Sequence, residues 1–390
     1  MEREMGHFGV IKTADSIISP LGYDTADNVN NILQGHSALR QHSLWDIPEP
    51  FMASLFNNGE FFAIARDRIA SSIAMTRFEM LAILSAKQAI EKCDIDPASP
   101  RTIFIISTTK GNVELLGQAA DNIPAERISP AASAAVIAGY FGNTNTPIVV
   151  SNACTSGACA QLLAARLLSA GHYDHAIVVG AEVQSKFIVS GFLSFKALSP
   201  EACRPFDKER KGLNIGEGAG TIIYSIQKEN ETNGAWELLN GAISNDANHI
   251  SGPSRTGEGS YRVLMETIKG FDTKDIAFIN AHGTATPYND EMESIAITRA
   301  GLSEVPVNGL KGFYGHTMGA AGVIETILSQ KFLERGIIPP TKGFEELGVS
   351  GKLTINKNCT ATDKKAFIKL LSGFGGCNVA LLFKQKEVKA

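Results

Sequence analysis

Short apolar runs alternate with longer segments of helical periodicity along most of the chain. The longer segments place apolar residues three and four positions apart and predict helices over residues 76–93 and 318–336. The short runs are rich in β-branched residues and predict strands over residues 102–107, 147–151, 175–182, 220–226 and 275–283. Alternating strands and helices are typical of α/β proteins whose sheets are covered by helices. The pattern therefore predicts a layered α/β fold.

Proline and glycine mark the ends of further elements. A helix is expected from Ser129-Pro130 to Gly142, because proline is favoured in the first turn of a helix and glycine just after the last. The longest glycine-rich, loop-like zone covers residues 203–220, slightly past the middle of the chain. Single hydrophobic cores stop growing near about 250–300 residues, and this chain has 390. We therefore expect two halves, residues 1–225 and 226–390.

Composition narrows the classes of function. The chain has 36 basic and 40 acidic side chains and a formal charge of -4, which gives no bias toward nucleic acid. The first residues lack the pattern of a signal peptide, and no apolar run reaches the length of about 18 residues that predicts a membrane helix. The 6 cysteines form no dense framework, so we expect reduced thiols. These features predict a soluble, cytoplasmic protein that does not bind membranes.

The most informative segment is PIVVSNACTSGACAQLLAARLLSA, in which a strand-like run breaks at Ser151 and Asn152 before Cys154 opens a helix. The first turn of a helix favours an anion, so we expect this position to lower the pKa of the Cys154 thiol. Small neighbours leave room for a substrate carbonyl. The alternative is that Cys154 only packs, as free cysteines usually do. Cys159 is expected to face the core.

Two histidines have a setting that suits a functional site. His282 follows a predicted strand in NAHGTATP, and His316 precedes a predicted helix in GFYGHTMGAAG. Both are expected to be presented by loops. The glycines of GEGAG at 216–220 precede a strand rather than a helix, which argues against a nicotinamide cofactor.

Cys154, NAHGTATPYND and KGFYGHTMGAAG together resemble the β-ketoacyl-[acyl-carrier-protein] synthases, condensing enzymes of the thiolase superfamily. The resemblance extends from SPLGYDTADN to the terminal GFGGCNVALLF. It implies a thiolase-like fold, a five-layer αβαβα arrangement of two similar halves. It also implies that Cys154 carries the acyl group as a thioester, and that His282 and His316 assist the decarboxylation of malonyl-carrier and stabilise the enolate.

The resemblance assigns further roles. Lys311 and Glu293 are expected to form a supporting ion pair, and Phe374 to be a mobile gate whose backbone N–H completes the oxyanion hole. Thr284 and Thr286 are expected to hold the pantetheine arm. The remaining expected contacts are with the acyl group, at Lys110 and Phe192, and with an acidic carrier protein, at Lys196, Arg66 and Arg68.

The expected partners are an acyl carrier protein and a second subunit, either an identical one or a related one in a heterodimer. No metal is expected, and no cofactor beyond the phosphopantetheine of the carrier. Lys110 stands where such enzymes have a small or aliphatic residue near the acyl tunnel. Its ammonium either reaches solvent or caps a short or polar-ended tunnel. The reaction belongs to fatty-acid synthesis or to a specialised polyketide, polyene or pigment pathway.

Two alternatives to a condensing enzyme stay open. A non-catalytic partner subunit of the chain-length-factor type would shape another subunit's tunnel, and such partners usually lack the cysteine that stands here at position 154. A degradative thiolase uses a second cysteine as a base near its C-terminus, and Cys377 in GFGGCN is a poor match for that base.

Overall fold

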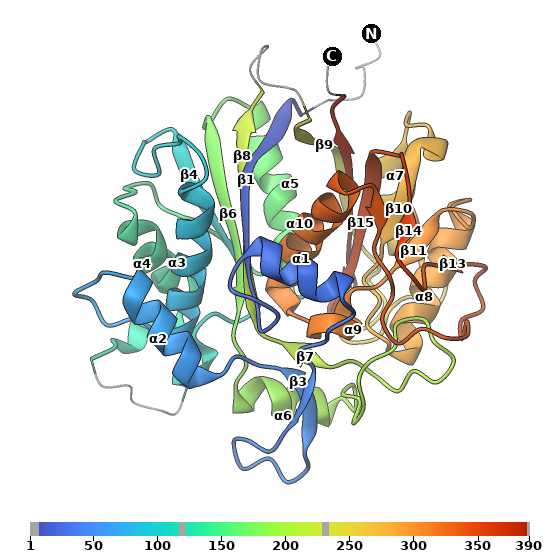
Figure 1. Cartoon of the computed structure of the whole chain (residues 1–390), viewed down its shortest axis with the longest axis horizontal. Helices are drawn as coiled ribbons and strands as arrows, with labels where there is room; N and C mark the ends of the chain where they lie inside the picture. The colour runs from blue at the N-terminus through green and yellow to red at the C-terminus, as the bar shows by residue number, and fades with distance from the viewer. Residues whose placement is uncertain (1–7, 117–121, 228–233, 388–390) are drawn as a thin grey trace.

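Helices and sheets alternate in five layers in the computed structural model, which describes residues 8–116, 122–227 and 234–387 (Figure 1). Outer helices cover one sheet, two central helices separate that sheet from a second one, and further outer helices cover the second sheet. The expected five-layer α/β arrangement is confirmed.

Each half of the chain builds one sheet. In spatial order, the first sheet contains β5 (Ile148–Val150), β4 (Thr102–Ser107), β6 (His175–Glu182), β8 (Gly218–Ile226) and β1 (Val10–Ile18). The second contains β13 (Thr354–Ile355), β11 (Pro306–Asn308), β10 (Ile276–Asn280), β15 (Ala366–Gly373), β16 (Cys377–Gln385) and β9 (Trp236–Asn245). One residue pair, Ile11 with Glu237, joins β1 to β9.

The two sheets repeat one topology. When the strands of each half are numbered along the chain, β5-β4-β6-β8-β1 and β11-β10-β15-β16-β9 both have the order 3-2-4-5-1, with β13 added at the edge of the second sheet. The first three strands of each set run parallel, and the last two are antiparallel to their neighbours. Equivalent strand ends therefore present equivalent loops, and this repeat is too diverged to be seen by eye in the sequence.

The central layer consists of α5 (Ser156–Ser169) and α10 (Ala321–Glu334). Their backbones approach so closely at glycines that a Cβ atom on Gly322 would lie only 2.4 Å from the Ala158 nitrogen. A Cβ atom on Gly157 would lie 2.9 Å from the Gly319 carbonyl oxygen. Both helices also contact strands of the other half, α5 at β9 and β16 and α10 at β6 and β8. The two halves therefore share one core.

The outer helices agree with the predicted boundaries. The helix α3 (Arg77–Ile90) begins with a capping box between Thr76 and Glu79, and α4 (Pro130–Tyr140) begins at Pro130. On the other side, α7 (Glu258–Ile268) and α8 (Pro287–Arg299) cover the second sheet.

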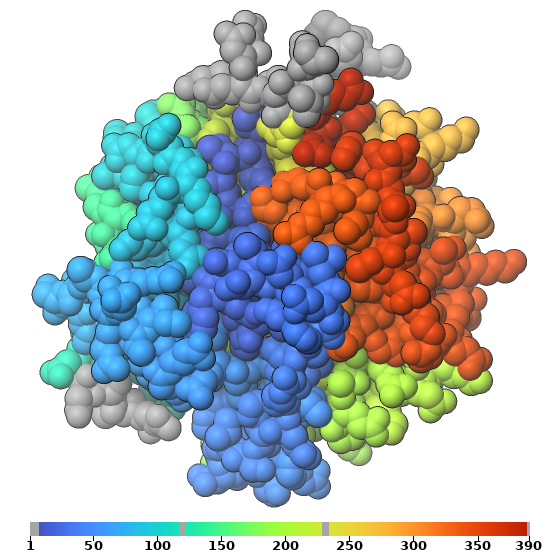
Figure 2. All heavy atoms as spheres, in the orientation of Figure 1, coloured from blue at the N-terminus to red at the C-terminus, as the bar shows by residue number. Residues whose placement is uncertain are grey.

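The remaining elements lie around this frame. Figure 2 shows α1 (Thr25–Leu33) within the blue segment that lies between the cyan and orange elements of the two halves. The other helices are α2 (Asn58–Arg68), α6 (Lys186–Ser194) and α9 (Lys311–Tyr314). Small sheets contain β2 (Arg40–His42), β3 (Phe51–Ser54) and β7 (Ile215–Gly216), and β12 (Ile337–Ile338) with β14 (Thr360–Ala361).

The expected division into residues 1–225 and 226–390 stays a prediction about folding units, and residues 228–233 lie outside the described part of the chain. None of the described helices combines the length and the apolar composition of a membrane-spanning segment.

Candidate active site

Chemically active side chains gather where strands of both sheets end. Cys154 follows β5, and His316 follows the equivalent strand β11 by way of α9. His282 follows β10, and Phe374 follows β15. Carboxyl ends of parallel strands are the usual place for a site in an open α/β sheet. The repeated topology thus brings residues that are far apart in sequence to one place.

A tight turn presents Cys154. Ala153 has a φ of 47°, a left-handed conformation that residues with a Cβ atom seldom adopt. The Ser156 hydroxyl donates to the Ala153 carbonyl at 2.6 Å and accepts from the Asn152 N–H at 2.8 Å. The sequence predicted Cys154 in the first turn of this helix. The helix α5 begins at Ser156, so Cys154 lies just before that turn.

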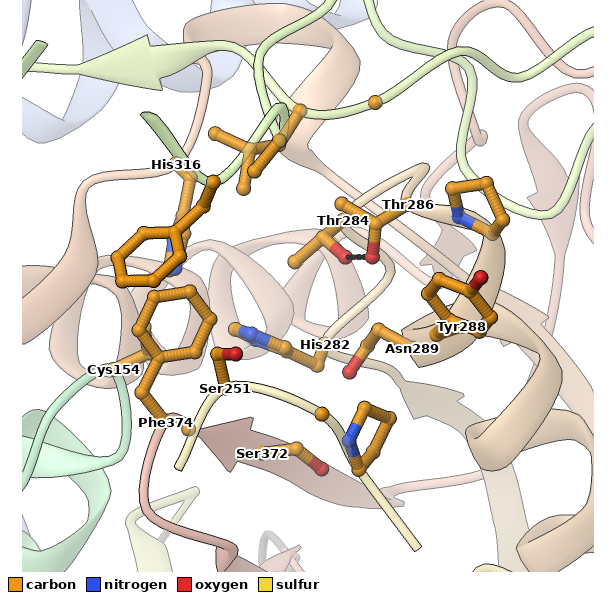
Figure 3. Close-up of a pocket in the computed structure, with 18 of the residues that line it drawn as sticks. Cys154, Ser251, His282, Thr284, Thr286, Tyr288, Asn289, His316, Ser372 and Phe374 are labelled. Carbon is orange, nitrogen blue, oxygen red and sulfur yellow. Dashed lines mark hydrogen bonds between the residues drawn. The ribbon is translucent and has the colours of Figure 1, made fainter. Parts of the chain in front are cut away.

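The two predicted histidines adjoin the thiol. A nitrogen of His282, a nitrogen of His316 and the Cys154 sulfur all lie within 4.8 Å of one another. The imidazole rings meet edge to face, with centroids 4.9 Å apart. All three side chains are buried at the inner end of one cavity (Figure 3). Thiolate and imidazole are also donors that Zn²⁺ prefers, so these residues could hold a metal, although the absence of a metal stays our prediction.

Burial controls the acidity of the thiol. It raises the pKa of Cys154 to about 11, against the lowering effect of the Lys110 and Lys311 charges and of the Phe374 backbone N–H. The expected lowering of the Cys154 pKa by the helix is therefore wrong for this structure, because desolvation outweighs the favourable charges.

The imidazoles are neutral at neutral pH. Burial, followed by the Lys311 charge, lowers the pKa of His282 and of His316 well below the ordinary value. The Met318 N–H donates to His316 Nδ1 at 3.3 Å, which places the His316 proton on Nε2. That Nε2 atom and His282 Nδ1 have no partner among the described residues. His316 can therefore donate a hydrogen bond to a bound group.

A buried network of charged side chains contacts the backbone of His282. The expected ion pair between Lys311 and Glu293 is wrong. Lys311 pairs with Glu325 at 2.8 Å, not with Glu293. Lys369 pairs with the other Glu325 oxygen at 2.5 Å, and Lys311 donates to the His282 carbonyl at 2.5 Å. Burial alone would raise the pKa of Glu325, but the two lysines lower it overall. Glu325 on α10 thus forms ion pairs with both buried lysines next to the active site.

Glu293 has a different structural role. It accepts from the backbone N–H of His282 at 2.7 Å and of Gly283 at 2.8 Å, and from the Asn289 side chain at 2.9 Å. Burial raises the Glu293 pKa. The ion pair was predicted wrongly because α8 aims this carboxyl at the backbone after β10, whereas the Lys311 ammonium points toward the central helix α10.

The cavity has a volume of about 410 Å³ and runs inward from an exposed mouth. Thr284 and Thr286 lie along it with their hydroxyl oxygens 2.9 Å apart, on the side of His282 away from Cys154 (Figure 3). At the inner end the Phe374 ring lies 5.9 Å from the Phe192 ring. Phe374 is 37% exposed and precedes Gly375 and Gly376, which both have positive φ. Glycines in this conformation suit a gate that moves.

The remaining predicted residues separate into two groups. Lys196 is exposed at the mouth of the cavity, whereas Lys110 is half-buried beside the Met318 sulfur and does not line the cavity. Arg66 and Arg68 lie on α2 and do not line the cavity. The structure therefore does not bring these two arginines to the site. Cys159 is buried in the core, as expected.

Sequence reasoning missed several residues of the site. Lys369 had a signal, since it is the one charge in the apolar strand β15, and Glu325 had one because it is the one charge in the buried first ten residues of α10. Cys377, considered only as a thiolase base, lines the cavity and donates to Asn152 Oδ1 at 2.9 Å. His249, for which the sequence analysis proposed no role, is exposed at the mouth. Tyr288, also at the mouth, is 78% exposed and had no signal.

Comparison with known protein families agrees with this geometry. The model of the β-ketoacyl synthase N-terminal domain matches residues 10–229, and that of the C-terminal domain matches residues 236–345. The chain belongs to the β-ketoacyl synthase family. It is thus an acyltransferase, a condensing enzyme of fatty-acid or polyketide synthesis.

The similarity to known proteins extends over almost the whole length of the chain. 3-Oxoacyl-[acyl-carrier-protein] synthase 2 of Rhizobium meliloti (strain 1021) is 29% identical over 96% of this chain and 98% of its own. A ketosynthase solved with its chain length factor from Xenorhabdus doucetiae has a TM-score of 0.84 at 24% identity, covering 97% of this chain and 98% of its own. The ishigamide ketosynthase/chain length factor structure has a TM-score of 0.81 at 25% identity, covering 97% and 99%.

Proposed function

We propose that this synthase catalyses a decarboxylative Claisen condensation between malonyl-carrier and an acyl group on Cys154. The proposal is supported above all by the placement of the Cys154 sulfur and two neutral imidazoles within 4.8 Å of one another at the inner end of one cavity. A thiol suits a labile acyl link, and hydrogen-bond donors suit an oxygen on which charge grows.

The first half-reaction loads the enzyme. The Cys154 sulfur attacks the carbonyl carbon of the acyl thioester, the bond to the carrier sulfur breaks, and the thiol proton of Cys154 ends on the released carrier thiol. The backbone N–H of Phe374, which faces the Cys154 sulfur, stabilises the oxyanion of the tetrahedral intermediate. Thr284 and Thr286 hold the pantetheine arm along the cavity.

The second half-reaction joins the two groups. The bond between the malonyl α-carbon and its carboxylate breaks, carbon dioxide leaves, and the electron pair passes into an enolate on the thioester oxygen. His282 and His316 hydrogen-bond that oxygen while its charge grows. The enolate carbon then attacks the Cys154 thioester, and the cysteine sulfur leaves as the thiolate.

Partners and location belong to the same proposal. An acyl carrier protein docks near the cavity mouth, where Lys196 offers a positive charge, while Arg66 and Arg68 lie outside this region. The name of the ishigamide ketosynthase/chain length factor structure pairs a ketosynthase with a chain length factor, which supports a related subunit as an alternative to a second identical one. All 6 cysteines are free, which supports work in the reducing cytoplasm.

The decisive experiment is intact-mass analysis after incubation with an acyl-pantetheine thioester. Cys154→Ala is expected to abolish the acyl adduct, whereas Cys159→Ala in the core and Cys377→Ser in the same cavity retain it. His282→Asn and His316→Asn are expected to suppress malonyl decarboxylation more than acyl loading, because the imidazoles act in the second half-reaction. Adducts on Cys377 that persist in the Cys154→Ala variant would contradict the proposal.

A further inference from the structure

The backbone that leads to His282 is held at three successive carbonyl groups. The Lys369 ammonium on β15 donates to the carbonyls of Asn280 and Ala281 at 3.3 Å each. Lys311 donates to the carbonyl of His282 at 2.5 Å. The strands β15 and β10 are neighbours, and Lys369 is the register partner of Asn280. Two buried lysines therefore fix the segment of chain that leaves β10 and presents the imidazole.

The Lys369 ammonium has no hydrogen bond to spare. Besides the two carbonyls, it donates to Glu325 Oε2 at 2.5 Å. An ammonium group has three N–H donors, so all three are used. Both side chains of this ion pair are fully buried. A buried ammonium with all its donors engaged holds its three acceptors in one geometry.

The ion pair between Lys369 and Glu325 links the segments that carry the two histidines. Glu325 lies in the second turn of α10, and His316 precedes that helix by five residues. Lys369 thus joins the backbone before His282 to the helix after His316. In the second half-reaction both imidazoles hydrogen-bond one oxygen, so the distance between the rings, 4.9 Å from centroid to centroid, has to be kept.

The orientation of His282 depends on its backbone more than that of His316 does. His316 Nδ1 accepts from the Met318 N–H, whereas His282 Nδ1 has no partner among the described residues. A displacement of the backbone before His282 therefore moves the imidazole. A misplacement of about 1 Å in an active site can lower the rate by about 100-fold.

The charge of Lys369 acts on both rings as well. Burial and the Lys311 charge lower the pKa of His282 and of His316, and the Lys369 charge lowers both further. Lys369 therefore helps to keep the two imidazoles neutral.

We propose that Lys369 is a positioning residue for the second half-reaction, which holds the backbone before His282 against α10 so that both imidazoles meet one thioester oxygen. The inference rests on the proposed function, since it concerns the decarboxylation step. None of the three hydrogen bonds of the ammonium reaches the turn that carries Cys154. Acyl loading therefore does not depend on Lys369.

The test compares the two half-reactions in Lys369→Met, which nearly keeps the length of the side chain and removes the ammonium. Acylation of Cys154 by acetyl-pantetheine, followed by intact mass, is expected to stay within about twofold of the wild-type rate. The acylated enzyme is then given malonyl-pantetheine, and release of carbon dioxide is measured. Its maximal rate is expected to fall at least about tenfold at an unchanged half-saturating concentration, because the change affects the transition state and not binding.

Lys364→Met is the matched control. This exposed lysine donates at 3.2 Å to the carbonyl of Ile276, at the start of the same strand β10, so its loss is expected to change neither rate. Lys369→Gln is a second variant, needed if the unpaired buried carboxylate of Glu325 unfolds Lys369→Met, which a thermal melt shows. Its amide can donate to Glu325 but has only two N–H groups, so release of carbon dioxide is expected to be slow here too.

A rate of carbon dioxide release within about twofold of wild type in either folded variant would overturn the inference, as would an equal loss of acyl loading. The proposed function survives both results if His282→Asn still slows carbon dioxide release. If folded wild-type enzyme neither forms the Cys154 adduct nor releases carbon dioxide, the proposed function itself fails, and the inference about Lys369 fails with it.

Discussion

At the scale of single residues, the resting nucleophile is a protonated thiol in a buried site. Burial raises the pKa of Cys154 to about 11, and the positive charges of Lys110 and Lys311 reduce that rise. The imidazoles are neutral for the same reason, since burial lowers their pKa. The site therefore presents neutral groups to the incoming thioester, and charge develops only during the reaction.

This acidity predicts how Cys154 reacts with iodoacetamide. Below its pKa the thiolate fraction grows tenfold for each pH unit, so the alkylation rate of Cys154 should rise by about that factor per unit from pH 7 to pH 10 without a plateau. Lys110→Met removes a charge that lowers the pKa, so its rate should be severalfold lower at each pH. Peptide mass spectrometry measures both rates, with the exposed Cys359 as the internal reference. A plateau for Cys154 below pH 8 would contradict the high pKa.

The sequence was sufficient to predict Cys154, His282 and His316 as neighbours, but not the charges beneath them. The three residues sit in short glycine-rich motifs that survive as local signals. Lys311 was paired with the wrong acid because the choice between Glu293 and Glu325 depends on how α8 and α10 are oriented, and spacing along the chain does not contain that information. The available signal was that Glu325 is the one charge in the buried first ten residues of α10.

At the scale of elements, the central helices α5 and α10 pack closely against each other. Gly157 and Gly322 allow their backbones to touch, so the helices that follow Cys154 and His316 are held against each other. This contact helps to fix the distance between the thiol and the imidazole.

Gly322→Ala is therefore expected to destabilise the protein by about 1–3 kcal/mol, since overpacking forces backbone shifts in a dense core. The matched control is Gly139→Ala in α4, an exposed helical position where a Cβ atom meets nothing within 4 Å. That change should leave stability unchanged or raise it by about 0.4–1 kcal/mol, because alanine restricts the unfolded chain. Denaturant unfolding measures both, and equal effects would refute the close contact.

The elements themselves were predictable in part. Strong periodicity and capping residues predicted α3, α4 and α10, and β-branched runs predicted β4, β6 and β8. The strands β1, β9, β15 and β16 were not predicted, and in β9 the apolar pattern is interrupted by Asn240 and Gly241. The order of the strands in the sheets was not predicted either, since pairing between distant segments leaves no periodic trace.

At the scale of the whole molecule, β5 is an apolar edge. Ile148, Val149 and Val150 are all half-buried, and within the described residues β5 pairs only with β4. An unprotected apolar edge strand favours pairing with another chain. Because Cys154 follows β5 by a few residues, a second subunit there would also support the turn that presents the nucleophile.

We therefore expect a dimer in solution with a mass of twice 41.6 kDa, and Val149→Lys is expected to give monomers and to reduce acyl loading of Cys154. Light scattering after size exclusion measures the mass, and a thermal melt shows whether the variant is folded. Thr146→Lys, at an exposed position just before β5, is a milder second variant. Folded Val149→Lys that stays dimeric would place the interface elsewhere.

The position of β16 has a consequence for how the enzyme is made. This strand, the last of those described, lies between β15 and β9 in the second sheet and contacts α5. While a ribosome synthesises the chain, the helix behind the nucleophile emerges long before the strands that complete its apolar surroundings. Until then, the apolar surface of the amino-terminal half stays exposed, so chaperones are expected to increase the yield of folded enzyme. Loss of β16 would remove a strand that packs against the central helix α5.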